Sequence, residues 1–285
     1  MVLQAKVNGL LGAELENGVL AAQVSFGSGL LIIALVMALR KSTRSEIEFL
    51  RTSVRAKNLP WWFLLAGSLG GFFVITQGLT AGLLGISIFT MSVVTGQSIS
   101  AVLIDSLGLL GMTAVRLNVA RIIGVLLTGV GLVVTNLGTE GSLSWQVLMP
   151  LIAGAGIGFQ QAMNGKIGKE SQSPLLATLI NFMVGSAIIA LVLIFTGINF
   201  GNLIWPSNPW LYLGGLIGVV FIFAQVVIVR IIGVLAMGIS LLFGQLATSV
   251  IIDILIPTGH NPFALQNIVG LTLVGIGALF VIRKR

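Results

Sequence analysis

The sequence predicts an all-α integral membrane protein with ten transmembrane helices, arranged as two inverted repeats of five helices. Three observations predict this fold: the composition, ten long apolar segments, and a pattern of polar residues that occurs twice. Of 285 residues, 56% are hydrophobic and 8% are charged, and the mean hydropathy is +1.09. A soluble domain carries about 25% charged residues, so lipid must surround much of this chain. The composition excludes a soluble enzyme, a disordered protein and, despite a pI near 10.6, a nucleic-acid-binding module.

The ten apolar segments follow one another along the whole chain. A helix needs roughly 20 mostly apolar residues to cross a bilayer. The segments cover approximately residues 1–13, 18–39, 61–81, 83–105, 119–138, 146–166, 174–196, 210–228, 231–255 and 266–282. All seven Pro residues lie in connections or at segment ends, and all five Trp residues lie at segment ends, where an interfacial aromatic belt is expected.

The basic residues predict the orientation of these segments. With a cytoplasmic N-terminus, 14 of the 15 Lys and Arg residues fall in cytoplasmic connections or the C-terminal tail. The exception is Lys6, inside the first segment. The outer connections then contain Glu14, Glu16, Glu140 and the single His260. The positive-inside rule therefore predicts a multi-pass protein with both termini in the cytoplasm.

The polar residues show that the chain contains two related halves. Residues 4–29 align without gaps to 160–185, and residues 62–105 align without gaps to 210–253. Gly124, Gly129 and Gly131 match Gly270, Gly275 and Gly277. We assign residues 1–142 to the first repeat and residues 143–285 to the second. Because each repeat has an odd number of helices, the second enters the membrane from the opposite side, as in many secondary transporters.

The first segment is shorter than its repeat partner. About a dozen apolar residues precede Gln160, whereas three residues precede Gln4. Twelve helical residues reach about 18 Å, which is less than the hydrocarbon core of roughly 30 Å. We expect the first helix to be truncated and the natural protein to begin upstream. The alternative is a short first helix that packs against its neighbours.

The residues NGKIGKESQSPLLATLINFMVG at 164–185, with the matching pattern in the first half, resemble the YdcZ-type branch of the drug/metabolite transporter (DMT) superfamily. The resemblance covers essentially the whole chain as a fused pair of five-helix units. It implies a DMT/EamA-like fold of ten helices and an exporter in the bacterial inner membrane. Smaller members of the superfamily use a buried Glu in the first helix, where this chain has Gln4, Asn8, Gln160 and Asn164.

Paired amide side chains are the candidate substrate-binding residues, because polar groups inside a bilayer are costly unless they are paired or face a wet cavity. Gln4 and Asn8 share one helix face, as do Gln160 and Asn164. The complete set is Gln4, Asn8, Gln77, Gln97, Gln160, Asn164, Gln225 and Gln245. The alternative for each pair is hydrogen bonding between helices without a substrate. Ser25 and Asn181, which match in the repeat, either face the cavity or bond to backbone groups.

Four carboxylates at segment ends are candidate gate residues: Glu14 and Asp253 near the outer face, and Asp105 and Glu170 near the inner face. The gate hypothesis pairs them with amides or Lys, for instance Asp105 or Glu170 with Lys166 or Lys169. The alternative is that they are solvated charges or helix caps.

These features predict a secondary transporter that exports small polar metabolites by alternating access. A stripped cation favours a formal negative charge, so an amide-lined site favours neutral or zwitterionic substrates. The alternative on the same fold is a flippase for lipids or lipid-linked molecules. With no Cys, one His and no phosphate-binding motif, we expect no catalytic residue, metal or cofactor. The expected partners are the substrate and the bilayer; a monomer is sufficient, and a homodimer stays open.

Overall fold

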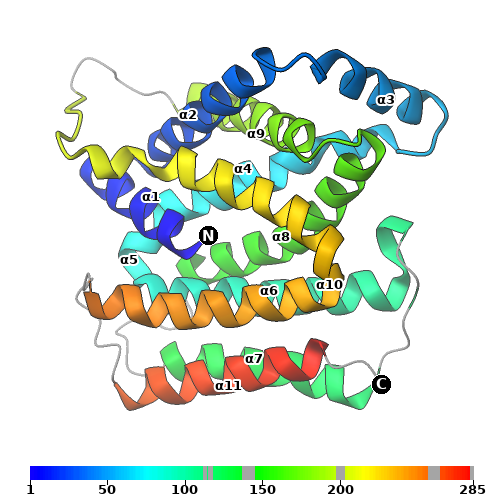
Figure 1. Ribbon diagram of the computed structural model, residues 1–285. Coiled ribbons are helices and arrows are strands. Elements are labelled where there is room, and N and C mark those ends of the chain that lie inside the picture. The colour runs from blue at the N-terminus through cyan, green and yellow to red at the C-terminus, as the bar shows by residue number, and fades with distance from the viewer. Residues whose placement is uncertain (112–113, 115–117, 137–144, 197–202, 256–263, 283–285) are drawn as a thin grey trace. The chain divides into compact units, whose positions relative to one another are not determined.

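The computed structural model describes residues 1–111, 114, 118–136, 145–196, 203–255 and 264–282 (Figure 1). Side chains are described for these residues except 111, 135–136, 145, 229–240 and 282. Within these residues all regular structure is helical, which confirms the predicted all-α class. The α-helices are α1 (Val2–Glu14), α2 (Gly18–Ala38), α3 (Thr43–Arg55), α4 (Ala66–Thr76), α5 (Gly82–Leu84), α6 (Ile86–Leu107), α7 (Val119–Asn136), α8 (Trp145–Glu170), α9 (Pro174–Thr196), α10 (Gly214–Leu255) and α11 (Leu265–Ile282).

Five of the described segments are long and apolar enough to cross a membrane: Gly18–Ala38, Trp61–Leu84, Ile86–Leu107, Pro174–Thr196 and Pro209–Ile228. Three shorter apolar helical segments are Val119–Val134, Leu241–Leu255 and Leu265–Val281. Every predicted segment lies on helical structure, and the count of ten membrane crossings stays a prediction. Local signals explain several ends: Asn17 accepts a hydrogen bond from the backbone N–H of Leu20 at the start of α2, and Ser173 does the same for Leu176 at the start of α9.

The third predicted segment is not one regular helix. It contains a 3₁₀ turn, Trp61–Leu65, then α4, then a π-helical turn, Gln77–Ala81, and then α5. Gly85 ends the segment with a φ of 76°, which favours glycine. Gly78, inside the π-helical turn, lies so close to Gly18 that a Cβ at either position would overlap the other backbone. The third segment therefore carries Gln77 at an irregular turn, a feature that often marks functional sites in helices.

The eighth and ninth predicted segments form one continuous helix. α10 runs for 42 residues without the break that we predicted between residues 228 and 231. A straight helix of this length would measure about 63 Å, twice the thickness of the hydrocarbon core. The sequence there, IVRIIGV, contains no Pro and a single Gly, so the backbone hydrogen bonds need not be interrupted.

The basic connection at residues 40–60, between the second and third predicted segments, contains a helix. α3 is a 13-residue amphipathic helix whose buried residues are Glu46, Leu50 and Ser53. Its apolar positions Ile47, Leu50 and Val54 recur at helical spacing, but Arg and Glu residues between them lower its hydropathy below that of a membrane helix.

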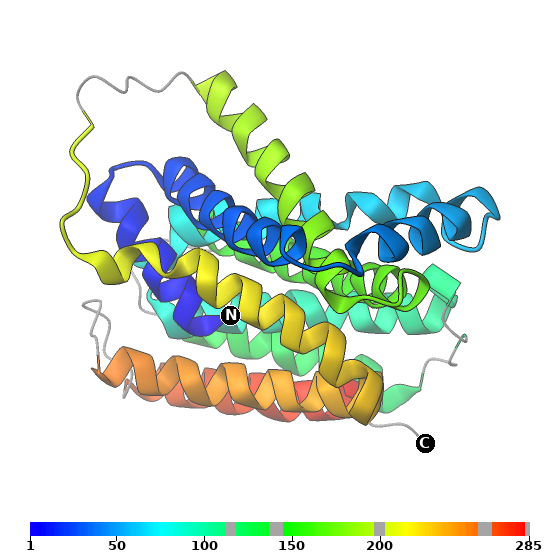
Figure 2. The same cartoon turned by 45° about the horizontal axis from the view of Figure 1, so that its top comes forward.

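The chain forms two compact units, each built from both predicted repeats. Unit 1 contains Leu3–Leu79 and Phe159–Gly233, with Met1; unit 2 contains Thr80–Gly158 and Val234–Arg285, with Val2. In unit 1, α9 packs against α2 and α4, and these helices lie side by side in Figures 1 and 2. In unit 2, α7 packs closely along α11. The predicted repeat boundary between residues 142 and 143 lies outside the described residues and stays a prediction.

The contacts inside each unit occur in matching pairs. In unit 1 a Cβ on Gly67 would lie 2.2 Å from the carbonyl oxygen of Asn181, and a Cβ on Gly215 would lie 2.4 Å from that of Ser25. Gly67 matches Gly215 in the repeat, and Ser25 matches Asn181. In unit 2 a Cβ on Gly124 would meet the carbonyl of Gly277, and a Cβ on Gly131 would meet that of Gly270. Gly67, Gly215, Gly124 and Gly131 are therefore recurring small residues at which helix backbones approach closely.

Candidate functional site

All eight predicted amide residues are buried, with exposed fractions from 0 to 9%. Six of them belong to unit 1: Gln4 and Asn8 on α1, Gln77 in the π-helical turn, Gln160 and Asn164 on α8, and Gln225 on α10. The other two, Gln97 on α6 and Gln245 on α10, belong to unit 2. The structure therefore divides the predicted set into a group of six and a group of two.

Hydrogen bonds join the amides of unit 1 in two places. Asn8 Nδ2 donates to Gln77 Oε1 at 2.7 Å, which links α1 to the π-helical turn. Gln160 Nε2 and Asn164 Nδ2 both donate to Asn181 Oδ1, at 2.7 and 3.1 Å, which links α8 to α9. Asn181 thus has a larger part in this cluster than the sequence suggested, because one carbonyl oxygen accepts from two buried side chains.

An aromatic pair lies between the two amide groups of unit 1. The rings of Phe26 on α2 and Phe182 on α9 have centroids 4.8 Å apart. A Cβ on Gly218 would contact Phe182 and lie 2.6 Å from Gln4 Nε2. A Cβ on Gly70 would contact Phe26 and lie 2.2 Å from Gln160 Nε2. These contacts show that Gln4 and Gln160 occupy equivalent surroundings beside the aromatic pair.

Several buried polar atoms of unit 1 have no hydrogen-bond partner, and six of them fall at matching positions of the two repeats. The matched atoms are Asn8 Oδ1 and Asn164 Oδ1, Gln77 Nε2 and Gln225 Nε2, and Ser25 Oγ and Asn181 Nδ2. Asn8 Oδ1 and Ser25 Oγ lie close together, because a Cβ on Gly214 would be 2.2 Å from the first and 2.7 Å from the second. Leaving a buried polar group without a partner costs roughly 1–3 kcal/mol, so this arrangement lowers stability.

The balance of donors and acceptors does not depend on how the amides are oriented. If the side-chain amide groups of Asn8 and Gln77 were both turned by 180°, so that their O and N atoms exchanged places, Gln77 Nε2 would donate to Asn8 Oδ1. Asn8 Nδ2 and Gln77 Oε1 would then be unpaired, which is again one donor and one acceptor. Each half of the cluster therefore offers at least one acceptor and one donor to a bound molecule.

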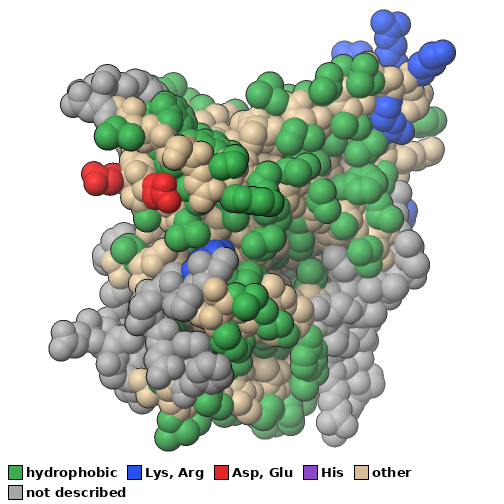
Figure 3. Space-filling view, turned by 60° about the vertical axis from the view of Figure 1, so that its left-hand side comes forward, with side chains coloured by type: hydrophobic (Ala, Val, Ile, Leu, Met, Phe, Trp, Pro, Cys, Tyr) green, Lys and Arg blue, Asp and Glu red, His purple; other side chains and the backbone are tan. Residues whose placement is uncertain are grey.

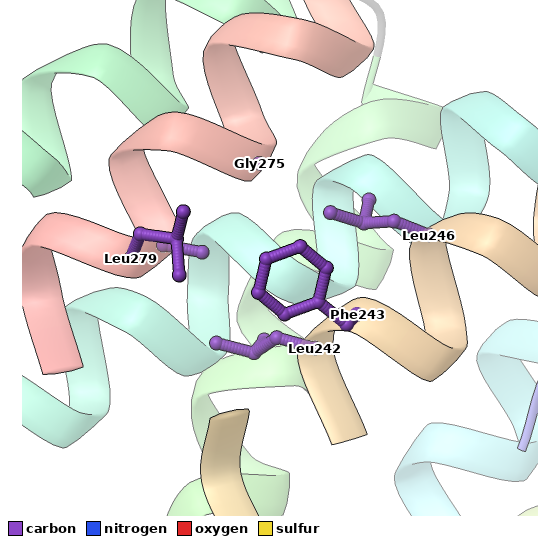
Figure 4. A pocket seen from close by; sticks show the side chains of 6 residues that line it. Leu242, Phe243, Leu246, Gly275 and Leu279 are labelled. Atoms are coloured by element: carbon purple, nitrogen blue, oxygen red, sulfur yellow. The ribbon is translucent and has the colours of Figure 1, made fainter. Parts of the chain in front are cut away.

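Unit 2 holds one amide pair and one apolar hollow. Gln245 Nε2 donates to Gln97 Oε1 at 3.4 Å, which links α10 to α6, while Gln97 Nε2 has no partner. Figure 4 shows the hollow between α10 and α11. It is lined by Leu242, Phe243, Leu246, Gly275, Ala278 and Leu279. Its volume of about 10 Å³ is room for one water molecule, and its lining offers no polar side chain to a solute.

The four candidate gate carboxylates have different surroundings. Asp253 is buried and accepts hydrogen bonds from the backbone N–H groups of Ile86 and Ser87, at 3.2 and 2.7 Å, so it caps the start of α6. Asp105 forms an ion pair with Arg121 at 2.8 Å. Glu170, at the end of α8, accepts a hydrogen bond from Ser53 on α3. Glu14 is exposed at the end of α1.

The partners of two of these carboxylates differ from the sequence expectation. We expected Asp105 or Glu170 to contact Lys166 or Lys169, but Asp105 contacts Arg121 and Glu170 contacts Ser53. Lys166 instead lies over the ring of Phe63, with its Nζ 5.3 Å from the centroid. Lys166, Lys169 and Glu170 all lie on α8, which continues to Glu170.

Two buried basic residues were not among the predicted site residues. Arg121 lies in the first turn of α7 with its side chain 3% exposed. Its Nε and Nη1 atoms have no partner beyond the Asp105 contact made by Nη2. Lys6 is also buried, and helical spacing places it on the side of α1 opposite to Gln4 and Asn8. The sequence signal for the ion pair was the acidic residue Asp105, which lies 16 positions before Arg121.

A family model matches both halves of the chain, residues 1–134 and 145–280, and it is described as "Putative inner membrane exporter, YdcZ". The chain belongs to this family. Membership places it in the DMT superfamily and in the inner membrane, as the sequence predicted. No curated protein matches the chain.

Proposed function

We propose that the protein is a secondary transporter that exports small neutral or zwitterionic polar solutes, and that the amide cluster of unit 1 binds them. This cluster consists of the buried residues Gln4, Asn8, Ser25, Gln77, Gln160, Asn164, Asn181 and Gln225. The observation that carries the proposal is the matched set of unpaired polar atoms at Asn8 and Asn164, Gln77 and Gln225, and Ser25 and Asn181. A cluster that served only to join helices would be more stable with these atoms paired or replaced by apolar groups. Their retention in both halves supports a role in binding a solute that supplies the missing partners.

The chemistry of the cluster supports a solute without net charge. Its members are amides and hydroxyls, which donate and accept hydrogen bonds but carry no formal charge. A zwitterion or a neutral amide-like molecule also presents both donors and acceptors and would satisfy both kinds of atom. A desolvated organic cation would lack a carboxylate partner among these residues.

The burial of the cluster supports alternating access. Asn8, Asn164 and Asn181 are each at most 1% exposed, so a solute reaches them only after helices move apart. The matched backbone contacts of Gly67 with Asn181 and of Gly215 with Ser25 support the predicted inverted repeats, which would provide equivalent routes from the two sides. The family description supports export as the direction of transport.

The test is solute binding by the purified protein, measured as a change in thermal unfolding. Wild type is compared with Asn8→Ala/Asn164→Ala in the presence of neutral, zwitterionic, cationic and lipid-phosphate compounds. A ligand at 100 times its Kd stabilises a protein by about 2.7 kcal/mol. We expect a neutral or zwitterionic compound to stabilise wild type and to have little effect on the variant.

The matched control is Ser98→Ala/Thr178→Val. Ser98 and Thr178 are also buried, but each already donates to a carbonyl of its own helix, at 2.8 and 2.9 Å. The control should keep the ligand-induced stabilisation. Stabilisation by cations alone, or stabilisation that survives in Asn8→Ala/Asn164→Ala, would contradict the proposed site.

A further inference from the structure

The amphipathic helix α3 is the most strongly charged segment of the described chain. Between Arg40 and Lys57 there are six basic and two acidic residues. Figure 3 shows blue Lys and Arg side chains gathered near the top of the view, at the height of α3 in Figure 1. The amide cluster and the proposed transport cycle do not use this charge.

The basic residues of α3 lie on one face of the helix. Arg44, Arg51 and Arg55 are separated by seven and four residues, so they form a single stripe, and all three are exposed. The buried residues Leu50 and Ser53 lie on the other side of the helix. α3 therefore packs against unit 1 through one face and presents arginines on the other.

On the buried face of α3, side-chain contacts hold one of the two acidic residues away from the arginine stripe. Glu46 is buried, forms an ion pair with Arg40 at 3.0 Å, and accepts a hydrogen bond from Ser42 at 3.0 Å. Ser53 donates to Glu170 at the end of α8. Glu48 is the remaining acidic residue of the helix and borders the stripe.

The neighbouring segments hold α3 close to the membrane surface. α2 ends at Ala38 and α3 begins at Thr43, so the two ends are at most about 18 Å apart. After α3, Trp61 and Trp62 begin the next membrane segment with exposed fractions of 66% and 42%. Exposed Trp side chains at the end of a membrane helix lie at the level of the lipid headgroups.

We propose that α3 is a binding site for anionic phospholipids, whose phosphate groups contact Arg44, Arg51 and Arg55 from the membrane surface. Guanidinium groups bind phosphate through paired hydrogen bonds, and an anionic leaflet attracts basic segments near its surface. Ile47, which is 47% exposed at the edge of the stripe, reaches the boundary between headgroups and acyl chains. The hydrogen bond from Ser53 to Glu170 connects this lipid site to α8, which carries Gln160 and Asn164.

The test uses the full-length protein in detergent, titrated with phosphatidylglycerol or phosphatidylcholine while thermal unfolding is measured. Phosphatidylglycerol should stabilise wild type, and phosphatidylcholine and free glycerol phosphate should not. Each basic residue near an anionic surface contributes roughly fivefold to affinity, so Arg44→Gln/Arg51→Gln/Arg55→Gln should bind phosphatidylglycerol about a hundredfold more weakly. Arg44→Lys/Arg51→Lys/Arg55→Lys keeps the charge and should lose much less.

The matched control is Lys41→Gln/Lys57→Gln/Lys169→Gln, which removes three positive charges from exposed positions outside the stripe. It should lose clearly less affinity than Arg44→Gln/Arg51→Gln/Arg55→Gln, because the arginine stripe itself is unchanged. An equal loss in the control would show diffuse surface charge and overturn the proposal, as would the absence of a phosphatidylglycerol effect on wild type. Stabilisation by free glycerol phosphate would show a soluble-anion site and overturn it as well.

Discussion

Asn181 and Ser25 occupy matching positions in the two repeats, yet their side chains have different partners. Asn181 accepts hydrogen bonds from Gln160 and Asn164, whereas Ser25 Oγ has no partner. Asn181→Ala should therefore lower the free energy of unfolding by roughly 1–3 kcal/mol, because two buried amides lose their acceptor. Ser25→Ala should not lower stability and should raise the free energy of unfolding by up to roughly 1–3 kcal/mol, because it removes an unpaired buried hydroxyl without the loss of a hydrogen bond. Thermal and denaturant unfolding measure both; a large loss for Ser25→Ala would show that its hydroxyl is paired.

Ser25→Ala also separates stability from function at one residue. If Ser25 Oγ contacts the solute, this variant should bind the solute more weakly although it is at least as stable as wild type. Ligand-induced stabilisation is the measurement. Unchanged binding would remove Ser25 from the site.

Gly67 and Gly165 test the close packing of helix backbones in unit 1. A Cβ on Gly67 would lie 2.2 Å from the carbonyl oxygen of Asn181, while a Cβ on Gly165 would meet nothing within 4 Å. Gly67→Ala should destabilise by about 1–3 kcal/mol, because the backbone of α9 must move away. Gly165→Ala should stabilise by roughly 0.5–1 kcal/mol, because Gly is a poor helix former. Unfolding midpoints of the two variants that shift in the same direction would contradict this packing.

At the residue scale, the sequence predicted which side chains are buried but not which atoms remain unpaired. The eight amides were identifiable because they recur at fixed spacing in an apolar background. Their division between two units and the central position of Asn181 depend on how helices from different halves pack, and no local pattern reports that.

Among the elements, α6 begins with a side-chain cap from another helix. Asp253 on α10 accepts hydrogen bonds from two free N–H groups at the start of α6. Asp253→Ala should cost about 1–2 kcal/mol, the usual loss for removing a cap, while Asp253→Asn should lose less because an amide oxygen still accepts. Transport by Asp253→Asn should be close to wild type. Normal stability with abolished transport in Asp253→Asn would favour the gate hypothesis over the cap.

The pair Gln97 and Gln245 connects α6 and α10 within unit 2. Gln97→Leu or Gln245→Leu alone leaves a buried amide unpaired, while the double variant removes both. Wild type, the two single variants and the double variant form a double-mutant cycle. Their free energies of unfolding should give a coupling energy of about 0.6 kcal/mol, which is typical of hydrogen bonds between membrane helices. A coupling energy near zero would show that the pair does not interact. Loss of solute binding in a stable double variant would place both residues in the substrate site.

Two elements differ from the sequence expectation for identifiable reasons. α3 has apolar residues at helical spacing, but its strong charge and its length of 13 residues make it unlike a membrane-spanning segment of about 20 apolar residues. Arg230 lowers the hydropathy between the eighth and ninth predicted segments, so the sequence predicted a connection there. The backbone hydrogen bonds of α10 nevertheless continue through this sequence, IVRIIGV, which contains one Gly and no Pro. Hydropathy reports where a chain can lie in lipid, and it does not report where a helix ends.

For the whole molecule, the repeats in the sequence and the compact units in the structure are different divisions of the chain. Each unit combines segments from both halves, as residues 3–79 and 159–233 do in unit 1. The candidate site therefore needs both repeats, and either half alone would lack half of its donors and acceptors. Such interleaving could not be read from the sequence, because repeats report common ancestry of segments and not their packing partners.

Alternating access requires the amide cluster to open in turn to the two sides of the membrane. The protein contains no Cys, so Ser25→Cys supplies a single reactive thiol in the cluster. A membrane-impermeant methanethiosulfonate reagent is applied to vesicles of either orientation, with and without the solute found in the binding test. We predict modification from both sides, slowed by the solute in each case. Modification from one side only, or from neither, would contradict alternating access at this site.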